Sequence, residues 1–198
     1  MGKLKKDLGK QEQGEITRKN IIHISRKLFG KKGYNGTSTE DILLELGLTR
    51  GALYHHFASK RDIFYAVCVE INKEYSINLE KIDWFKLKKQ WHKFLDLAND
   101  REFIQIWLLD SYSVLSWEEI LELDDLFIIQ PLTDILKESI AKDHIRVLHI
   151  EETAQIILGM INQALLVLSK SGIKEKSTKK KNFKLIIDNY LETLEEMS

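Results

Sequence analysis

The sequence predicts an all-α fold, with a small N-terminal three-helix domain followed by a larger helical C-terminal domain. Its 198 residues include one proline and ten glycines, which leaves little room for a loop-rich β protein. Beyond residue 60, apolar residues recur at the spacing of one helix face. Hydrophobic residues make up 43% of the chain, enough for a sizeable core. We divide the chain into residues 1–14, 15–62 and 63–198.

Residues 1–14 are predicted to form a flexible basic arm. The segment carries Lys3, Lys5, Lys6 and Lys10. It lacks the apolar residues that would bury it against a core, so we expect it to be mobile.

Residues 38–47 are predicted to form a short capped helix. Ser38 is a good N-cap, and Asp41 follows at the spacing of a capping box. An apolar stripe of Ile42, Leu43 and Leu46 comes next. Gly47 then stands where a helix C-terminus favours a residue with positive φ, so the helix is expected to stop there.

A second short helix is predicted to run from Thr49 to Phe57. Thr49 supplies the N-cap, and Leu48 fills the turn before it. Leu53 and Phe57 are four residues apart, so they share a face and should point into the core. The opposite face then carries Gly51, Ala52 and His55, with Arg50 near the N-terminal end and Tyr54 on the flank.

The outer face of this second helix is typical of a surface that contacts DNA. Gly51 costs about 1 kcal/mol in a helix relative to alanine, which is reasonable where another molecule approaches the backbone. A helix-turn-helix places the N-terminal residues of its second helix against base edges in the major groove. Arg50 could pair bidentately with guanine, while Tyr54, His55 and His56 could contact phosphates or base edges.

A longer set of positions keeps a fixed spacing across residues 16–65. These positions are Leu28, Phe29, Gly33, Tyr34, Thr37, Ser38, Asp41, Ile42, Leu46, Gly47, Leu48, Gly51, Leu53, Tyr54, His56, Phe57, Ser59 and Lys60. The set resembles the DNA-binding domain of the tetracycline-repressor-like (TetR) family of bacterial transcription regulators. Many relatives carry smaller residues at Leu43 and Leu44, a difference that affects packing. Recognition-helix residues vary freely in this family, so no operator sequence is predicted.

The resemblance implies roles at the DNA, residue by residue. Phosphate contacts would come from Thr37, Thr39, Tyr54, His56 and Lys60. The bases would lie closest to Arg50, Gly51, Ala52 and His55. Ser38 and Thr49, at the two helix starts, complete the predicted DNA-binding site. Simpler roles remain open: Thr37 and Ser38 as caps, Lys60 as a solvated lysine, and Tyr54 as a residue packed on the domain.

Charge is distributed unevenly along the chain. Lys plus Arg and Asp plus Glu number 30 each. Residues 1–62 nevertheless carry 13 basic against 7 acidic residues, and the remainder carries 17 against 23. A basic module is what binding a polyanion requires, because phosphate neutralisation supplies most non-specific affinity. The arm could add minor-groove or phosphate contacts, or remain an ordinary solvated tail.

The rest of the chain is predicted to be helices separated by short polar breaks. The first runs from Lys60 to about Glu80 and would link the two domains. Further helices are expected over 84–98, 102–115, 117–130, 131–142, 150–170 and 179–196. Pro131 either begins a new helix or kinks a long one.

The last two helices are predicted to form a homodimer interface. The first is apolar nearly all the way round, and Gly159 and Ala164 would allow close approach. The resemblance implies that both helices pair with their copies as a four-helix interface. Two recognition helices would then meet major grooves roughly 34 to 36 Å apart on a palindromic double-stranded DNA operator. The alternative is a large internal core helix.

Aromatic residues concentrate between residues 83 and 130, which predicts a pocket for a small-molecule effector of apolar or aromatic character. The candidate lining residues are Trp91, Phe94, Phe103, Trp107, Asp110, Tyr112, Trp117, Phe127 and Asn162. The alternative is that the aromatic residues are plain core. The resemblance implies a repressor that leaves its operator when the effector favours a dimer with misplaced recognition helices.

Other classes of protein have weaker support. His144, His149, Glu151 and Glu152 lie near a loop, but their spacing matches no zinc pattern. We therefore predict no enzyme, metal or cofactor. A chain without a run of about twenty apolar residues is expected to be cytoplasmic and without a membrane segment. A helical co-regulator that binds a protein partner rather than DNA is the main alternative, and a small helical enzyme is the weaker one.

Overall fold

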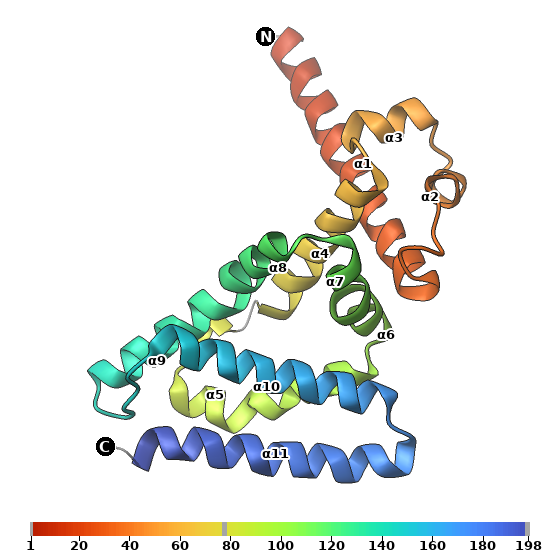
Figure 1. Ribbon diagram of the computed structural model, residues 1–198. Helices are drawn as coiled ribbons and strands as arrows, with labels where there is room; N and C mark the ends of the chain where they lie inside the picture. The colour runs from red at the N-terminus through yellow and green to blue at the C-terminus, as the bar shows by residue number, and fades with distance from the viewer. Residues whose placement is uncertain (1, 77–78, 197–198) are drawn as a thin grey trace.

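The computed structural model describes residues 2–76 and 79–196, and every regular element within them is a helix. This confirms the predicted all-α class. Figure 1 shows a small N-terminal unit set at one end of a larger helical layer. The unit comprises α1 (Gly2–Lys32), α2 (Thr39–Leu46) and α3 (Arg50–His56), and α4 (Lys60–Ser76) leads from it into the layer.

The first helix is longer than the sequence predicts. It begins at Gly2, so the backbone of residues 2–14 continues into α1 instead of forming a separate arm. Lys, Leu, Gln and Glu are good helix formers, and extending an existing helix avoids a second nucleation cost. Further along, Ile21, Ile22 and Phe29 are buried and fix α1 to the core.

The helix-turn-helix has the predicted caps. The Ser38 hydroxyl accepts from the Asp41 N–H at 3.0 Å, and the Asp41 carboxylate accepts from the Ser38 N–H at 2.8 Å, which completes the capping box. Gly47 ends α2 with a φ of 63°, in the left-handed region where glycine is favoured. Thr49 caps α3 by accepting from the Ala52 N–H at 3.2 Å. Local sequence signals therefore set both helices.

The larger layer begins after α4 with a series of short helical pieces. Two of its predicted helices, over 84–98 and 102–115, change their winding part of the way along. The pieces are η1 (Leu79–Lys81), α5 (Trp84–Gln90), the 3₁₀ segment η2 (Trp91–Asn99), α6 (Arg101–Phe103), the π-helical segment η3 (Ile104–Asp110) and α7 (Ser111–Val114).

One long helical run settles the alternative at Pro131. The run consists of α8 (Trp117–Asp124), the π-helical segment η4 (Asp125–Ile129) and α9 (Gln130–Ala141). The residues at its junctions keep right-handed helical backbone angles. Because proline has no N–H to donate to the preceding turn, a local change of winding is expected just before it. Pro131 therefore interrupts one long helix.

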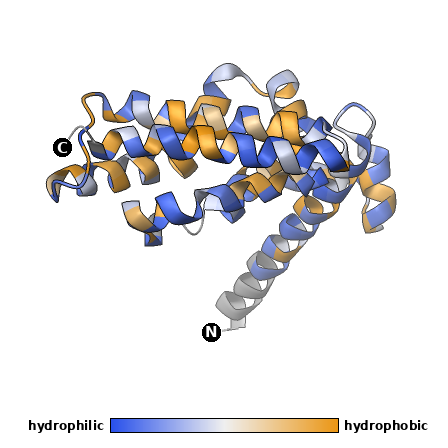
Figure 2. Ribbon diagram, turned by 90° about the horizontal axis from the view of Figure 1, so that it is seen from below, coloured by the Kyte–Doolittle hydropathy of each residue, from blue (hydrophilic) through white to orange (hydrophobic). Residues whose placement is uncertain are grey.

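The layer closes with α10 (Ile150–Lys170) and α11 (Ile173–Glu196), which lie side by side (Figure 1). The helix α11 starts earlier than the predicted residue 179. The helix α10 also contacts η2, η3, η4 and α9, so it is central to the layer. Figure 2 shows apolar and polar residues mixed along most of the helices.

Candidate DNA-binding surface and effector cavity

The two faces of α3 differ in the way the sequence predicts. Leu53 is fully buried and Phe57 nearly so, whereas the Tyr54 side chain is 40% exposed. A Cβ atom added to Gly51 would meet nothing within 4 Å, so the backbone there is open to an approaching molecule. Arg50 is exposed beside it, with its guanidinium 5.8 Å from the Tyr54 ring and 3.8 Å from a Glu40 oxygen. This exposed ion pair is weak, so Arg50 can turn to another acceptor.

The two histidines of α3 lie at its C-terminal end. Their rings are 5.3 Å apart and nearly perpendicular. His55 is exposed and His56 is half-buried. Ala52 is also half-buried, on the same helix as the open backbone of Gly51. The exposed face of α3 therefore offers a cation, two imidazoles and a phenol around a patch without a side chain.

Residues at the start of α2 are committed mainly to the cap. The Asp41 carboxylate also accepts from Lys32 Nζ at 2.9 Å. Hydrogen bonds from the Ser38 backbone and Lys32 lower the pKa of Asp41 to about 2. The Thr39 hydroxyl lies 3.1 Å from a Glu40 carboxylate oxygen, to which it donates. Ser38 and Thr49 thus fix the starts of α2 and α3, and both residues are exposed at the surface.

Two predicted phosphate contacts have internal partners in the structure. Thr37 is 1% exposed, and its hydroxyl donates to the Gly33 carbonyl at 2.9 Å. Its side chain therefore holds the turn before α2 and is closed to a phosphate, which corrects the prediction. Lys60 Nζ donates to the carbonyls of Tyr34 and Thr37, both at 2.9 Å, and lies 3.9 Å from the Tyr34 ring centre. Two of the three ammonium donors are used, so Lys60 first ties α4 to this turn.

A cavity lies inside the C-terminal layer, among α4, η2, η3, α8, α10 and α11. Its volume is about 70 Å³. Five of the predicted pocket residues line it: Trp91, Phe94, Phe103, Trp107 and Asn162. The indole N–H of Trp91 donates to Asp188 on α11 at 2.8 Å, which fixes this part of the wall. Ligand sites usually measure roughly 300 to 1,000 Å³, so a ligand of ordinary size can enter this cavity only if the side chains of its wall move apart.

Four predicted pocket residues lie elsewhere. The Asp110 carboxylate accepts from the Tyr34 N–H at 2.7 Å and from the Gln105 side chain at 3.0 Å, so it joins η3 to the N-terminal unit. Tyr112 and Trp117 are exposed, with ring centres 6.3 Å apart. Phe127 packs half-buried against the core, outside the cavity wall. Helical spacing cannot tell which side of a helix faces a cavity when several partners surround it.

Three polar residues on the wall were missed by the sequence analysis. They are Asn72 and Tyr75 of α4 and Asp124 of α8. The Asn72 amide donates to the Cys68 carbonyl at 3.0 Å, and the Tyr75 hydroxyl donates to Asp100. Asp124 differs because its Oδ1 atom is buried without a hydrogen-bond partner. Burial raises its pKa to about 6. A signal was available, since Asp124 stands four residues from both Ile120 and Ile128, on an apolar stripe.

One segment touches both the cavity and the N-terminal unit. Within residues 101–110, Phe103 and Trp107 line the cavity, whereas Asp110 holds Tyr34. The Arg26 side chain on α1 donates to Glu102 at 2.9 Å. Gly30 is pressed so closely on Glu102 that a Cβ atom there would lie 3.1 Å from the Glu102 Cα. A change in the cavity wall at this segment would therefore reach α1.

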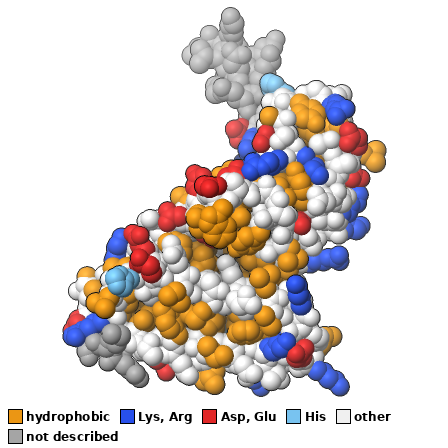
Figure 3. Space-filling view, in the orientation of Figure 1, with side chains coloured by type: hydrophobic (Ala, Val, Ile, Leu, Met, Phe, Trp, Pro, Cys, Tyr) orange, Lys and Arg blue, Asp and Glu red, His pale blue; other side chains and the backbone are white. Residues whose placement is uncertain are grey.

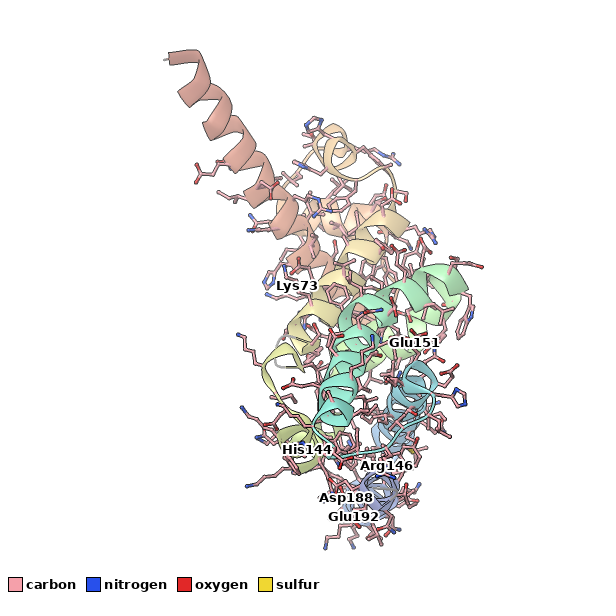
Figure 4. The ribbon with its side chains drawn as sticks, turned by 90° about the vertical axis from the view of Figure 1, so that its left-hand side faces the viewer. Lys73, His144, Arg146, Glu151, Asp188 and Glu192 are labelled. Carbon is pink, nitrogen blue, oxygen red and sulfur yellow. The ribbon has the colours of Figure 1, made fainter. Side chains whose placement is uncertain are left out.

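The residues considered for a metal site do not come together. Figure 4 shows His144 and Glu151 well apart, with His144 near the end of α9. The His144 ring packs on Phe85, with ring centres 4.7 Å apart. Within the described part of the chain, no three His, Cys, Asp or Glu side chains are grouped so as to hold a metal ion.

The capped helix pair, the open face of α3 and the separate helical layer define a helix-turn-helix transcriptional regulator. Residues 21–67 match the family described as bacterial regulatory proteins, tetR family. Residues 84–188 match the tetracyclin repressor-like C-terminal domain, which covers more than half of the chain. The protein belongs to this family, as its resemblance predicts.

Some known relatives are similar to nearly the whole chain, and others only to a short part of it. The Transposon Tn10 TetC protein of Escherichia coli is 22% identical over 191 residues, covering 94% of this chain and 96% of that protein. The regulator AcrR of Shigella flexneri is 44% identical over 54 residues, covering 27% of this chain and 25% of AcrR. A TetR-family regulator from Pectobacterium atrosepticum has the same fold, with a TM-score of 0.74 and 23% identity over 92% of this chain and 96% of that chain.

Proposed function

We propose that the protein is a homodimeric repressor that binds a palindromic operator through α3 and leaves it when a small molecule enters the cavity. The observation that carries this proposal is the open face of α3. There an exposed Arg50 stands beside the unobstructed backbone of Gly51, while Leu53 anchors the opposite face. A helix held in this way can enter a major groove without rearranging its core.

Dimerisation is supported by apolar surface on the last two helices. Ile156 on α10 and Leu185 and Ile186 on α11 are each more than half exposed. Figure 3 shows apolar side chains gathered over α10 on one face of the molecule. By length and composition alone, α10 is also able to cross a membrane, with a third of its most apolar window buried. A second copy of the chain would cover this surface, which suits a cytoplasmic protein.

The coupling between effector and operator would pass through residues 101–110. A ligand that enlarges the cavity pushes on Phe103 and Trp107, and Asp110 and Glu102 on the same segment hold α1 and Tyr34. The segment includes the π-helical η3, whose winding can revert to α-helical and shift residues along the axis. The two recognition helices of a dimer would then lose their operator spacing.

The test is selection from a library of random DNA duplexes at two salt concentrations. An enriched palindrome with strongly salt-dependent affinity would support the proposal, because phosphate contacts release counterions. Gly51→Leu fills the open patch on α3 and is expected to weaken operator binding by at least about tenfold. Gly172→Leu is the matched control, since Gly172 also has nothing within 4 Å but lies in the turn between α10 and α11.

The outcome also separates DNA binding from the alternative of a protein partner. If the Gly51→Leu variant kept its affinity for the operator, α3 would not be part of the DNA interface. Absence of any selected motif at both salt concentrations would contradict operator binding by the free protein and favour a co-regulator.

A further inference from the structure

We propose that the cavity takes a small cationic ligand, a quaternary or protonated amine, held between the Asp124 carboxylate and the aromatic wall. This inference deepens the proposed function and rests on the cavity being the effector site. It specifies a positively charged effector and names Asp124 as its partner. The aromatic composition of residues 83–130 predicts neither of these.

The first argument is the state of Asp124. It lines the cavity at the C-terminal end of α8, and its Oδ1 atom is buried with no hydrogen-bond partner. An unsatisfied buried carboxylate is costly, and native structures rarely keep one without a use. Burial opposes its ionisation, which agrees with the raised pKa near 6. At neutral pH the group is therefore mainly an anion without a partner.

The second argument is the charge of the wall. Among the described residues that line the cavity, Asp124 is the one with a formal charge, and none is Lys, Arg or His. Asn72 already donates to the Cys68 carbonyl, and Tyr75 donates to Asp100. The wall therefore does not neutralise Asp124 from within. A ligand that brings a positive charge would remove the cost of leaving this carboxylate unpaired.

The third argument is that aromatic side chains make up much of the cavity wall. Trp91 and Trp107 line the cavity together with Phe94, Phe103 and Tyr75. Aromatic rings attract cations through their quadrupole, most strongly for tryptophan and where water is excluded. A quaternary ammonium also has apolar methyl groups, which suit the leucine and isoleucine side chains of the same wall. Charge, rings and apolar surface thus favour one kind of ligand.

An outer cleft offers the competing ligand class. It measures about 520 Å³, shares Tyr75, Trp91 and Phe94 with the cavity, and carries Lys81, Lys86 and Lys93. These lysines favour an amphipathic anion with its head group outside and its tail in the cavity. Lys81, Lys86 and Lys93 are exposed, so water and salt screen their charges, whereas Asp124 is partly buried with its Oδ1 atom enclosed, so its charge is screened less. The buried group should decide the sign of the ligand, and an anion is an arm of the test.

The experiment compares ligands of one shape and different charge on the full-length protein. Choline and its neutral carbon analogue 3,3-dimethylbutan-1-ol differ chiefly in the positive charge, and octanoate represents an amphipathic anion. Binding is followed by calorimetry and by the intrinsic tryptophan fluorescence, to which Trp91 and Trp107 of the cavity wall contribute. We expect choline to bind at least about tenfold more tightly than the neutral analogue. Asp124→Asn should abolish this preference, and Asp125→Asn, an adjacent exposed carboxylate with the same charge change, should keep it.

Three results would overturn the inference. They are equal affinity for choline and its neutral analogue, a preference that survives Asp124→Asn, and tighter binding of octanoate than of choline. Operator binding is measured on the same samples. A protein that binds its operator but shows no preference for a cation disproves this inference alone, whereas loss of operator binding in the parent protein disproves the proposed function.

Discussion

Two aspartates, one in the N-terminal unit and one in the C-terminal layer, show how differently the two regions are built. Asp41 is partly exposed in the N-terminal unit, where hydrogen bonds from Ser38 and Lys32 lower its pKa to about 2. Asp124 lies partly buried in the C-terminal layer with its Oδ1 atom enclosed and unpartnered, and this burial raises its pKa to about 6. The first carboxylate stabilises a local helix start, and the second is held at a cost by the packing around it. The N-terminal unit is therefore specified by short-range signals and the cavity by long-range ones.

The largest expected effect comes from the small core of the N-terminal unit. Leu53→Ala removes a fully buried side chain that anchors α3. It should cost about 2 to 5 kcal/mol of stability and abolish operator binding. Leu44→Ala, at an exposed position on α2, is the control and should leave both nearly unchanged. Thermal unfolding measures the difference, and equal melting temperatures for the two variants would contradict the assigned packing.

The second-largest effect is expected at the contact that joins the two regions. Asp110→Ala leaves the Tyr34 N–H without its acceptor. The expected cost is about 1 to 3 kcal/mol, together with a higher effector concentration for release of the operator. Asp134→Ala, at an exposed position on α9, should change neither. Titration of the operator complex with effector tests this, and an unchanged release curve for Asp110→Ala would exclude this route of coupling.

Asp124 should make stability depend on pH in the direction opposite to Asp41. Its folded pKa lies above the ordinary value of 3.8, so the folded state binds the proton more tightly than the unfolded state. Stability should therefore fall as pH rises from about 4 to about 6. Asp124→Asn removes this loss and should be more stable at pH 8 by on the order of 1 to 3 kcal/mol. Denaturant unfolding across this range measures it, and a variant less stable than the parent at pH 8 would contradict an unpaired anion.

The smallest expected effect is at the capping box. Ser38→Ala should cost about 1 kcal/mol, because the N-cap hydroxyl satisfies a backbone donor of α2. The contribution of Asp41 is present above its ordinary pKa of 3.8 and should be lost as pH falls towards 2. Ser177→Ala, at an exposed position on α11, is the control. Melting curves that coincide for both serine variants would show that the cap adds nothing to global stability.

The two regions also differ in how much of their structure could be predicted from the sequence alone. Ser38, Asp41, Gly47 and Thr49 act within a few residues of themselves, so their roles in α2 and α3 were predictable and are confirmed. The burial of Thr37 was not, because its partner at Gly33 depends on how the turn folds back. Lys60 likewise binds carbonyls more than twenty residues away.

The cavity shows the limit most clearly. Aromatic composition located the region, and Trp91, Phe94, Phe103 and Trp107 do line a cavity. Composition could not separate them from Tyr112 and Trp117, which lie at the surface of neighbouring helical segments. Asp110 was predicted to line the pocket but joins two domains instead, whereas Asp124, which the sequence analysis did not single out, lines the cavity.

By itself the sequence determined the all-α class, the family and the two capped helices that present α3. Those features depend on composition, on helical periodicity and on contacts between residues a few positions apart. The tertiary structure alone decided that Lys60 holds a turn, that residues 101–110 join the cavity to α1, and that the Oδ1 atom of Asp124 is buried without a hydrogen-bond partner. Each of these depends on which helix faces which, and helix packing brings together residues that no local pattern connects.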